Sequence, residues 1–214
     1  MDLDKREYYL IGAFLMALIP LILFALFWWS IASLDILNMM VIPESSIAVF
    51  AIAGLATGIF LNVIYLKRWI LKFYEMRRAL SILLYLICSF MAVAFFMGFP
   101  IGNLLLGFLG GVYIGRKYHH LNADNATFSS ASQKASIFTA SVTSLEALLI
   151  GLLVLREESA IDFINRILGF GLFHKNEFID IAFILILCII LFLTQYYITL
   201  SGTKISFNKI EGKK

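Results

Sequence analysis

Charged residues are scarce in this chain of 214 residues. Asp, Glu, Lys and Arg together make up 14% of it, whereas 61% of its residues are apolar. A soluble domain carries about 25% charged and about 45–50% apolar residues. A soluble protein of this length could not hide so much apolar surface, because most of its residues must still face water. The composition therefore excludes an ordinary soluble domain and indicates a membrane protein.

Cysteines and catalytic signatures are also sparse. Cys88 and Cys188 each lie in an apolar run without a CxxC pair, so we expect neither a disulfide framework nor a redox dithiol. The chain contains no HExxH, no GxSxG and no Gly-rich phosphate loop. Arg116, His119, His120 and Asp124 are the only candidates for an enzyme that acts on lipid at the cytoplasmic face. As a metal site, the two histidines and Asp124 would need further ligands, which the sequence does not supply. We therefore expect no enzyme activity, no cofactor and no metal.

Long apolar runs dominate what is present. A spanning helix needs about 20 apolar residues, and six windows approach or exceed this length: 9–32, 46–66, 79–98, 101–118, 135–155 and 178–201. Arg116 and Lys117, at the end of the short fourth window, can extend their charged groups to the membrane interface. The sequence predicts an all-α polytopic membrane protein with a single six-helix transmembrane domain over residues 1–214.

The basic residues predict the orientation of this bundle. With six crossings, 14 of the 17 Lys and Arg residues fall on one side, and the other side receives Arg156, Arg166 and Lys175. The positive-inside rule then places both termini in the cytoplasm of a multi-pass cell-membrane protein. The external connection 156–177 has apolar residues at helical spacing, which predicts a short amphipathic segment on the outer surface or a lid on the helix ends.

Small residues recur every four positions in two windows. The fourth window carries Asn103, Gly107, Gly111 and Gly115, and the second carries Gly54, Gly58 and Asn62. Such a face lets two helix backbones approach closely. Three interpretations stay open: packing within the bundle, lining of a narrow substrate path, or dimerisation through the fourth window.

Two further positions carry local expectations. Asn103 falls in the first turn of its window, where capping of free N–H groups is favoured over ligand binding. Pro20 interrupts the first window and requires a neighbour that satisfies the carbonyl it frees.

Glu146 is the unusual residue of the fifth window. A charge at the bilayer centre costs about 2.5–3.5 kcal/mol even on the lenient insertion scale. Thr143, Thr139 and Ser136 precede it at steps of three and four residues, which predicts a polar stripe facing protein or water. Counting from the window ends places Thr57 and Ser89 nearest to the depth of Glu146. Glu146 is then either a neutral packing residue or the binding group for a proton, a cation or a cationic substrate.

Two main hypotheses of function follow. The first is a solute carrier, or the substrate-binding membrane subunit of a transporter, with Glu146, Thr143, Thr139, Thr57 and Ser89 as candidate substrate- or proton-binding residues; it expects a partly polar cavity around Glu146. The alternative is a non-catalytic assembly subunit that acts through its glycine faces. The partners expected are the lipid bilayer and, left open, other membrane subunits, a second copy or a small-molecule ligand. A nucleic acid is not expected, because the modest basic excess reflects topology.

Overall fold

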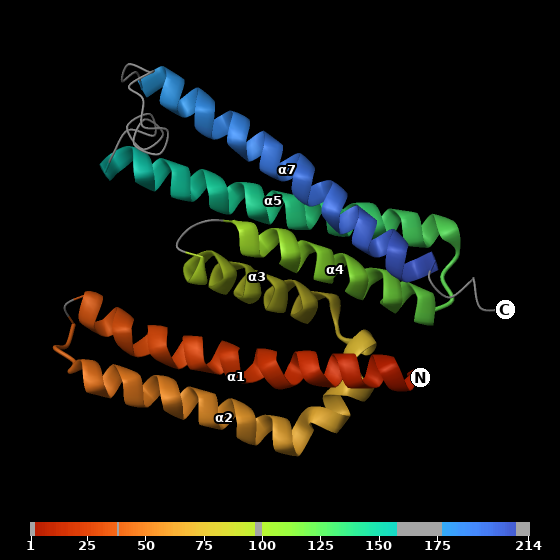
Figure 1. Cartoon of the computed structure of the whole chain (residues 1–214), viewed down its shortest axis with the longest axis horizontal. Helices are drawn as coiled ribbons and strands as arrows, with labels where there is room; N and C mark the ends of the chain where they lie inside the picture. Colours follow the sequence, from red (N-terminus) through yellow and green to blue (C-terminus); the bar gives the residue numbers. More distant parts are fainter. Residues whose placement is uncertain (1–2, 38, 97–99, 158–176, 209–214) are drawn as a thin grey trace. The chain divides into compact units, whose positions relative to one another are not determined.

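The structure, a computed structural model, describes residues 3–37, 39–96, 100–157 and 177–208. Within these ranges the protein is all-helical (Figure 1). Six α-helices and one 3₁₀ turn follow in chain order: α1 (Lys5–Ile36), α2 (Glu44–Leu71), η1 (Phe73–Glu75), α3 (Arg78–Phe95), α4 (Ile101–His120), α5 (Asn125–Glu157) and α7 (Glu177–Asn208). The amphipathic segment predicted for residues 156–177 lies, except for its two ends, outside the described residues.

Five of these helices are long and apolar enough to cross a membrane: α1, α2, α3, α5 and α7. Large apolar side chains are exposed along them, such as Val63, which is 82% exposed, and Ile189. Water would disfavour such a surface, whereas lipid tails cover it readily. The fourth helix, α4, is not among the five because its glycines, Asn103 and its basic end lower its mean hydropathy. A sixth crossing therefore stays a prediction.

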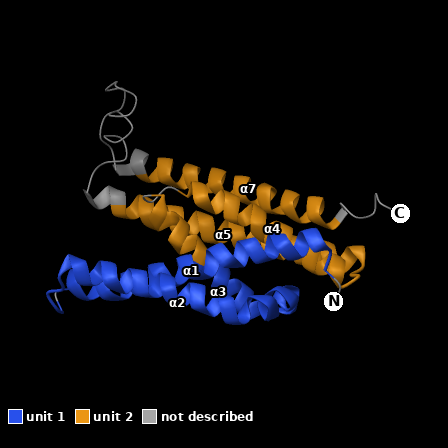
Figure 2. Cartoon of the chain, turned by 60° about the horizontal axis from the view of Figure 1, so that its bottom comes forward, with its two compact units in different colours: residues 1–87 blue, residues 88–214 orange. Residues whose placement is uncertain are grey.

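The chain divides into two compact units, residues 1–87 and residues 88–214 (Figure 2). The boundary falls within α3, so its first ten residues belong to the first unit and Ser89 belongs to the second. The single domain predicted for residues 1–214 stays a prediction.

In the first unit, α1 and α2 form an antiparallel pair that packs at two glycines of α2 (Figure 1). A methyl group at Gly54 would overlap the carbonyl oxygen of Leu23, and one at Gly58 would overlap the backbone of Pro20. Glycine is therefore required at both points because backbone, which cannot move aside, occupies the space of a side chain. Both glycines serve packing within the chain.

Asn62 lies one turn beyond Gly58 and bonds the backbone of α1. Its amide nitrogen donates to the carbonyl oxygens of Met16, at 3.2 Å, and Leu15, at 3.4 Å. Met16 precedes Pro20 by four residues, so its carbonyl is the one that the missing proline N–H cannot reach. The neighbour that Pro20 was predicted to require is thus Asn62, and the helix continues through the proline.

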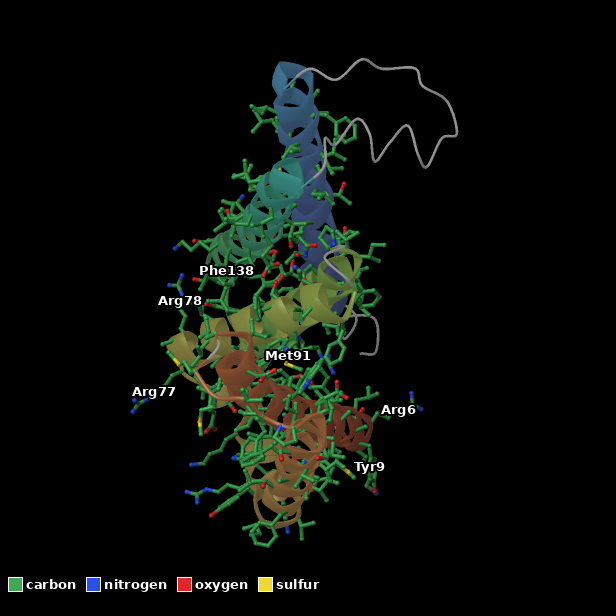
Figure 3. All side chains as sticks on the ribbon, turned by 90° about the vertical axis from the view of Figure 1, so that its left-hand side faces the viewer. Arg6, Tyr9, Arg77, Arg78, Met91 and Phe138 are labelled. Atoms are coloured by element: carbon green, nitrogen blue, oxygen red, sulfur yellow. The ribbon has the colours of Figure 1, made fainter. Side chains whose placement is uncertain are left out.

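A buried carboxyl group lies at the end of this helix pair where α1 begins and α2 ends. The Tyr74 hydroxyl donates to Oε1 of Glu7 at 2.5 Å, and both side chains are buried. The nearby arginines behave differently: Arg6, Arg77 and Arg78 are exposed and extend away from the ribbon (Figure 3). This distribution fits the membrane–water interface, where basic side chains reach lipid headgroups while a hydrogen-bonded carboxyl group packs within the protein.

In the second unit, α7 packs against both α4 and α5, running in the direction of α4 and opposite to α5 (Figure 1). The predicted glycine face of α4 lies on α7. A methyl group at Gly111 would overlap the carbonyl oxygen of Thr199, and one at Gly115 would overlap the carbonyl oxygen of Thr203. From the other side, a methyl at Gly202 would lie 2.7 Å from the carbonyl oxygen of Phe108. The two backbones are therefore in direct contact.

Two helices of this unit are longer than the apolar windows that predict them. The window 135–155 leaves out the first turns of α5, which begins at Asn125, and α7 continues beyond residue 201 to Asn208. These extensions pack on each other: the rings of Phe128 and Phe207 stack with centroids 3.9 Å apart and planes 9° apart. Residues 125–134, which lie between two of the predicted windows, are thus helix, because tertiary packing compensates for their low hydropathy.

Candidate functional site

Glu146 is half-buried in α5 and accepts two side-chain hydrogen bonds. The Ser89 hydroxyl donates to its Oε2 at 2.9 Å, and the Asn103 amide nitrogen donates to the same oxygen. Ser89, on α3, and Asn103, on α4, are both fully buried, so the two donors contact the carboxyl group inside the protein. Because both donors meet Oε2, the other oxygen, Oε1, is the one left to carry a proton or to contact a ligand.

The position of Asn103 corrects the sequence analysis. Capping of α4 was predicted for its side chain, but the start of α4 has no side-chain cap hydrogen bond. Instead the amide nitrogen bonds Glu146. Counting residues from the ends of the predicted windows places Asn103, in the first turn of its window, near the outer surface and Glu146 near the centre of the membrane. Counting assumes that helices run along the membrane normal, and helices that cross at an angle bring unequal nominal depths together.

Thr143 and Thr139 continue from Glu146 along one face of α5, as the sequence predicts, and both are buried. The Thr139 hydroxyl lies 2.8 Å from the hydroxyl of Thr199 in α7. One turn earlier on α7, the amide nitrogen of Gln195 donates to the same Thr199 hydroxyl at 3.3 Å. The stripe on α5 therefore faces a second polar stripe on α7.

This arrangement extends to the ends of both helices. Ser132 and Thr203 share a hydrogen bond between their hydroxyls. The Ser206 hydroxyl donates to the carbonyl oxygen of Val112 at 3.1 Å, which joins α7 to α4. We call the whole set the polar column, defined by these residues: Ser89, Asn103, Ser132, Ser136, Thr139, Thr143, Glu146, Gln195, Thr199, Thr203 and Ser206. All of them except Glu146 are buried.

The glycines of α4 create the room that the polar column occupies. A methyl group at Gly107 would overlap the amide of Gln195 and would lie 2.9 Å from the Thr199 hydroxyl. The amide of Gln195 thus fills the space that a side chain at position 107 would take. The glycine face therefore has a second role beyond backbone contact, since it admits a large polar side chain to the centre of the unit.

The column contains three of the four residues predicted to join Glu146, and the fourth lies elsewhere. Ser89, Thr143 and Thr139 belong to it, whereas Thr57 lies in the first unit, exposed, with its hydroxyl donating to the Ala53 carbonyl of its own helix at 2.8 Å. Asn103 joins it through a bond that sequence reasoning missed.

The stripe of α7 was also missed, although a signal for it exists. Gln195, Thr199, Thr203 and Ser206 recur at steps of three and four residues, the same spacing that marked the stripe of α5. Hydropathy ends the sixth window at residue 201 and so hides half of the pattern.

A groove with a volume of about 460 Å³ lies in the first unit and not at Glu146. Apart from Glu44 its lining is apolar: Phe24, Trp28, Ile47, Ala48, Ala51 and Ile52. A surface of this kind suits lipid tails, and it offers few groups that would orient a polar solute. At Glu146 the structure shows hydrogen bonds from Ser89 and Asn103, and the partly polar cavity predicted there stays a prediction.

The chemistry available to the polar column is that of oxygen ligands and one carboxyl group. Among the described residues no three His, Cys, Asp or Glu side chains come together as a metal-binding group. Hydroxyl, amide and carboxylate oxygens suit protons, water and hard cations rather than transition metals. Comparison of the chain with protein-family models, with curated proteins and with solved structures gives no match.

Proposed function

We propose that this protein is a small membrane transport protein, either a solute carrier or the membrane-embedded substrate-binding subunit of a transporter, in which Glu146 binds a proton or a cation. One observation carries the proposal: the carboxyl group lies at the end of a polar column that α4, α5 and α7 bury together. Polar side chains that are buried in a membrane protein mark pathways for ions and protons.

The isolation of Glu146 from other charges supports this role. No Asp, Lys, Arg, His or second Glu occurs in the stretches of α3, α4, α5 and α7 that surround it: 88–95, 101–115, 135–155 and 181–203. A structural ion pair would require a basic partner, and none of these stretches contains one. A carboxyl group held only by neutral donors is free to exchange a proton or to take a mobile cation as its counter-charge.

The proposed topology has six crossings, with α4 as the fourth and with both termini in the cytoplasm of a cell membrane. The distribution of 14 basic residues on one side supports it. The contact of α4 with α7 supports it too, because a helix whose small and polar face is covered by protein needs less hydropathy to lie in lipid.

The alternative, an assembly subunit that acts through glycine faces, is not carried forward. Its motive was a face open to a partner chain. Gly54 and Gly58 lie against α1, and Gly107, Gly111 and Gly115 lie against α7, so helices of the same chain cover both faces. A role through other surfaces would need a motive of its own.

The test compares parent, Glu146→Gln and Glu146→Leu proteins in detergent between about pH 5 and about pH 9, with thermal stability as the measurement. Gln keeps an acceptor for Ser89 and Asn103 but cannot ionise. We expect the Gln variant to fold and to show a flattened pH dependence. In proteoliposomes, an internal pH dye should report a flux of protons, or of a cation exchanged for protons, in the parent, and Gln should abolish it. A Gln variant that retains the full pH dependence of the parent would contradict the role of Glu146.

A further inference from the structure

Four buried oxygens in the second unit have no hydrogen-bond partner among the described residues: Asn103 Oδ1, Ser136 Oγ, Thr143 Oγ1 and Gln195 Oε1. Each belongs to a side chain with no exposed surface. Buried polar atoms are nearly always bonded to protein, water or an ion. Four such atoms in one small unit therefore indicate that water or an ion binds there.

Three of the four oxygens belong to side chains that a hydrogen bond or helix register places near Glu146. Asn103 Oδ1 belongs to the amide whose nitrogen bonds the carboxyl group, so it lies beside Glu146. Thr143 precedes Glu146 by three residues and shares its helix face. Ser136 lies about two turns farther along α5 and belongs to another part of the column.

Gln195 joins this group through the register of α5 and α7. The two helices are antiparallel and touch where the Thr139 hydroxyl meets Thr199. Four residues onward on α5 is Thr143, and four residues back on α7 is Gln195, so these two face each other one turn closer to Glu146. The nitrogen of Gln195 is bonded to Thr199, which leaves Oε1 on the opposite edge of the amide.

We infer that Glu146, Asn103, Thr143 and Gln195 form a binding site for a dehydrated monovalent cation of the size of sodium. The inference deepens the proposed transport function and rests on it. The ligands would be two amide oxygens, one hydroxyl oxygen and the carboxylate Oε1, since both donors already occupy Oε2.

The charge of the site selects the class of ion. Four hard oxygens replace part of a hydration shell, as carbonyl rings do in ion channels. A single carboxylate balances one positive charge, whereas sites for calcium use several carboxylates and those for magnesium keep several waters. The amide of Gln195 packs directly on Gly107 of α4, so this ligand belongs to a closely packed pair of helices.

The experiment measures the thermal stability of the purified protein as NaCl replaces choline chloride at constant ionic strength, with KCl as a second series. A ligand that binds only the folded state raises the melting temperature with its concentration. We expect a saturable rise with sodium, a smaller one with potassium and none with choline. Glu146→Gln should abolish the sodium response.

A pair of matched variants separates coordination from folding. Thr143→Val keeps the shape of the side chain and removes one ligand, so it should raise the sodium concentration at half-effect by about tenfold or more. Ser144→Ala is the control, because Ser144 is the next residue on α5, lies outside the polar column and donates its hydroxyl to the Cys188 carbonyl oxygen at 3.2 Å. It should lower the melting temperature in choline and leave the sodium half-effect unchanged.

The outcomes separate the two proposals. Equal melting temperatures of the parent in sodium and in choline would overturn the cation site, and the three oxygens would then hold water. If a pH dependence that requires Glu146 persists in that case, the transport proposal stands with a proton as its ion. If the parent and Glu146→Gln differ neither in sodium response nor in pH dependence, both proposals fall.

Discussion

The two compact units bury polar side chains for different purposes. In the unit of residues 1–87, Asn62 repairs the backbone by bonding the carbonyl that Pro20 frees, and Tyr74 bonds Glu7. In the unit of residues 88–214, the buried polar groups bond mainly to one another across helices and leave oxygens over. Asn62 Oδ1 also has no partner among the described residues, but the amide nitrogen of Asn62 bonds backbone carbonyls of α1. A polar group that serves the backbone indicates structure, whereas several surplus acceptors around a carboxyl group indicate a ligand.

The largest expected effect concerns close backbone contacts at glycines, which occur within each of the two units. Gly111→Ala places a methyl group on the Thr199 carbonyl, and we expect a loss of about 1–3 kcal/mol of stability or more, because the backbone of α7 must shift. Thermal unfolding in detergent measures it. Gly110→Ala is the matched control, since Gly110 is the residue before Gly111 on α4 and lies off the face that packs on α7. Equal losses for the two variants would show that the face does not decide packing.

The next effect sharpens the comparison within the second unit. Glu146→Leu leaves the Ser89 hydroxyl and the Asn103 amide buried without their acceptor. We expect destabilisation of about 1–3 kcal/mol relative to the parent. Glu146→Gln should lose less, because its amide oxygen can still accept both bonds. A Leu variant as stable as the parent would mean that these bonds contribute nothing to the bundle.

A double-mutant cycle tests the purpose assigned to the first unit. Asn62→Leu should cost about 1 kcal/mol, because the Met16 carbonyl loses its donor. In a Pro20→Ala background the helix supplies its own N–H to that carbonyl, so the same Asn62 substitution should cost clearly less. Thermal unfolding of the four proteins gives the coupling. Strictly additive losses would mean that Asn62 does not act on the proline carbonyl.

The smallest effect concerns the start of α5, in the connection from α4. The side chain and the backbone N–H of Thr127 hydrogen-bond Asp124 and lower the pKa of its carboxyl group. A lowered folded-state pKa adds stability above the unfolded value of about 3.9 and loses it as pH falls through the folded value. The parent should therefore lose this small contribution only below about pH 4, and Asp124→Asn should lack that part of the acid dependence. Unfolding across this range measures the difference, and identical acid profiles would remove Asp124 as a helix cap.

The sequence predicts helices and small-residue faces well, because their patterns are local. The spacing of Gly107, Gly111 and Gly115 marks a packing face whatever its partner. Pro20 lacks an N–H, so the sequence also indicates that another group must donate to the carbonyl four residues earlier. Neither pattern names that partner. Asn62 as the donor and α7 as the partner of α4 depend on which helices meet, which is a property of the assembled chain.

The candidate site is half predictable for the same reason. Thr143 and Thr139 share a helix with Glu146, so periodicity alone finds them. Asn103 was assigned to capping because the start of a helix is the usual place for such a bond, and tertiary contact overrode that preference. Gln195 and Thr199 lie in a window whose average hydropathy is high, so the average does not reveal them. Only their spacing of four residues marks a polar face.

The kind of contact that α7 makes with each neighbour has a mechanical consequence. Its seam with α4 is made of touching backbones at Gly111, Gly115 and Gly202, which cannot part without opening a void. Its contact with α5 includes two hydroxyl pairs, Thr139 with Thr199 and Ser132 with Thr203, and water can replace such bonds one for one. We therefore expect α4 and α7 to move together as one rigid body. Any opening of the second unit should begin between α5 and α7, where water can enter and replace the hydroxyl pairs.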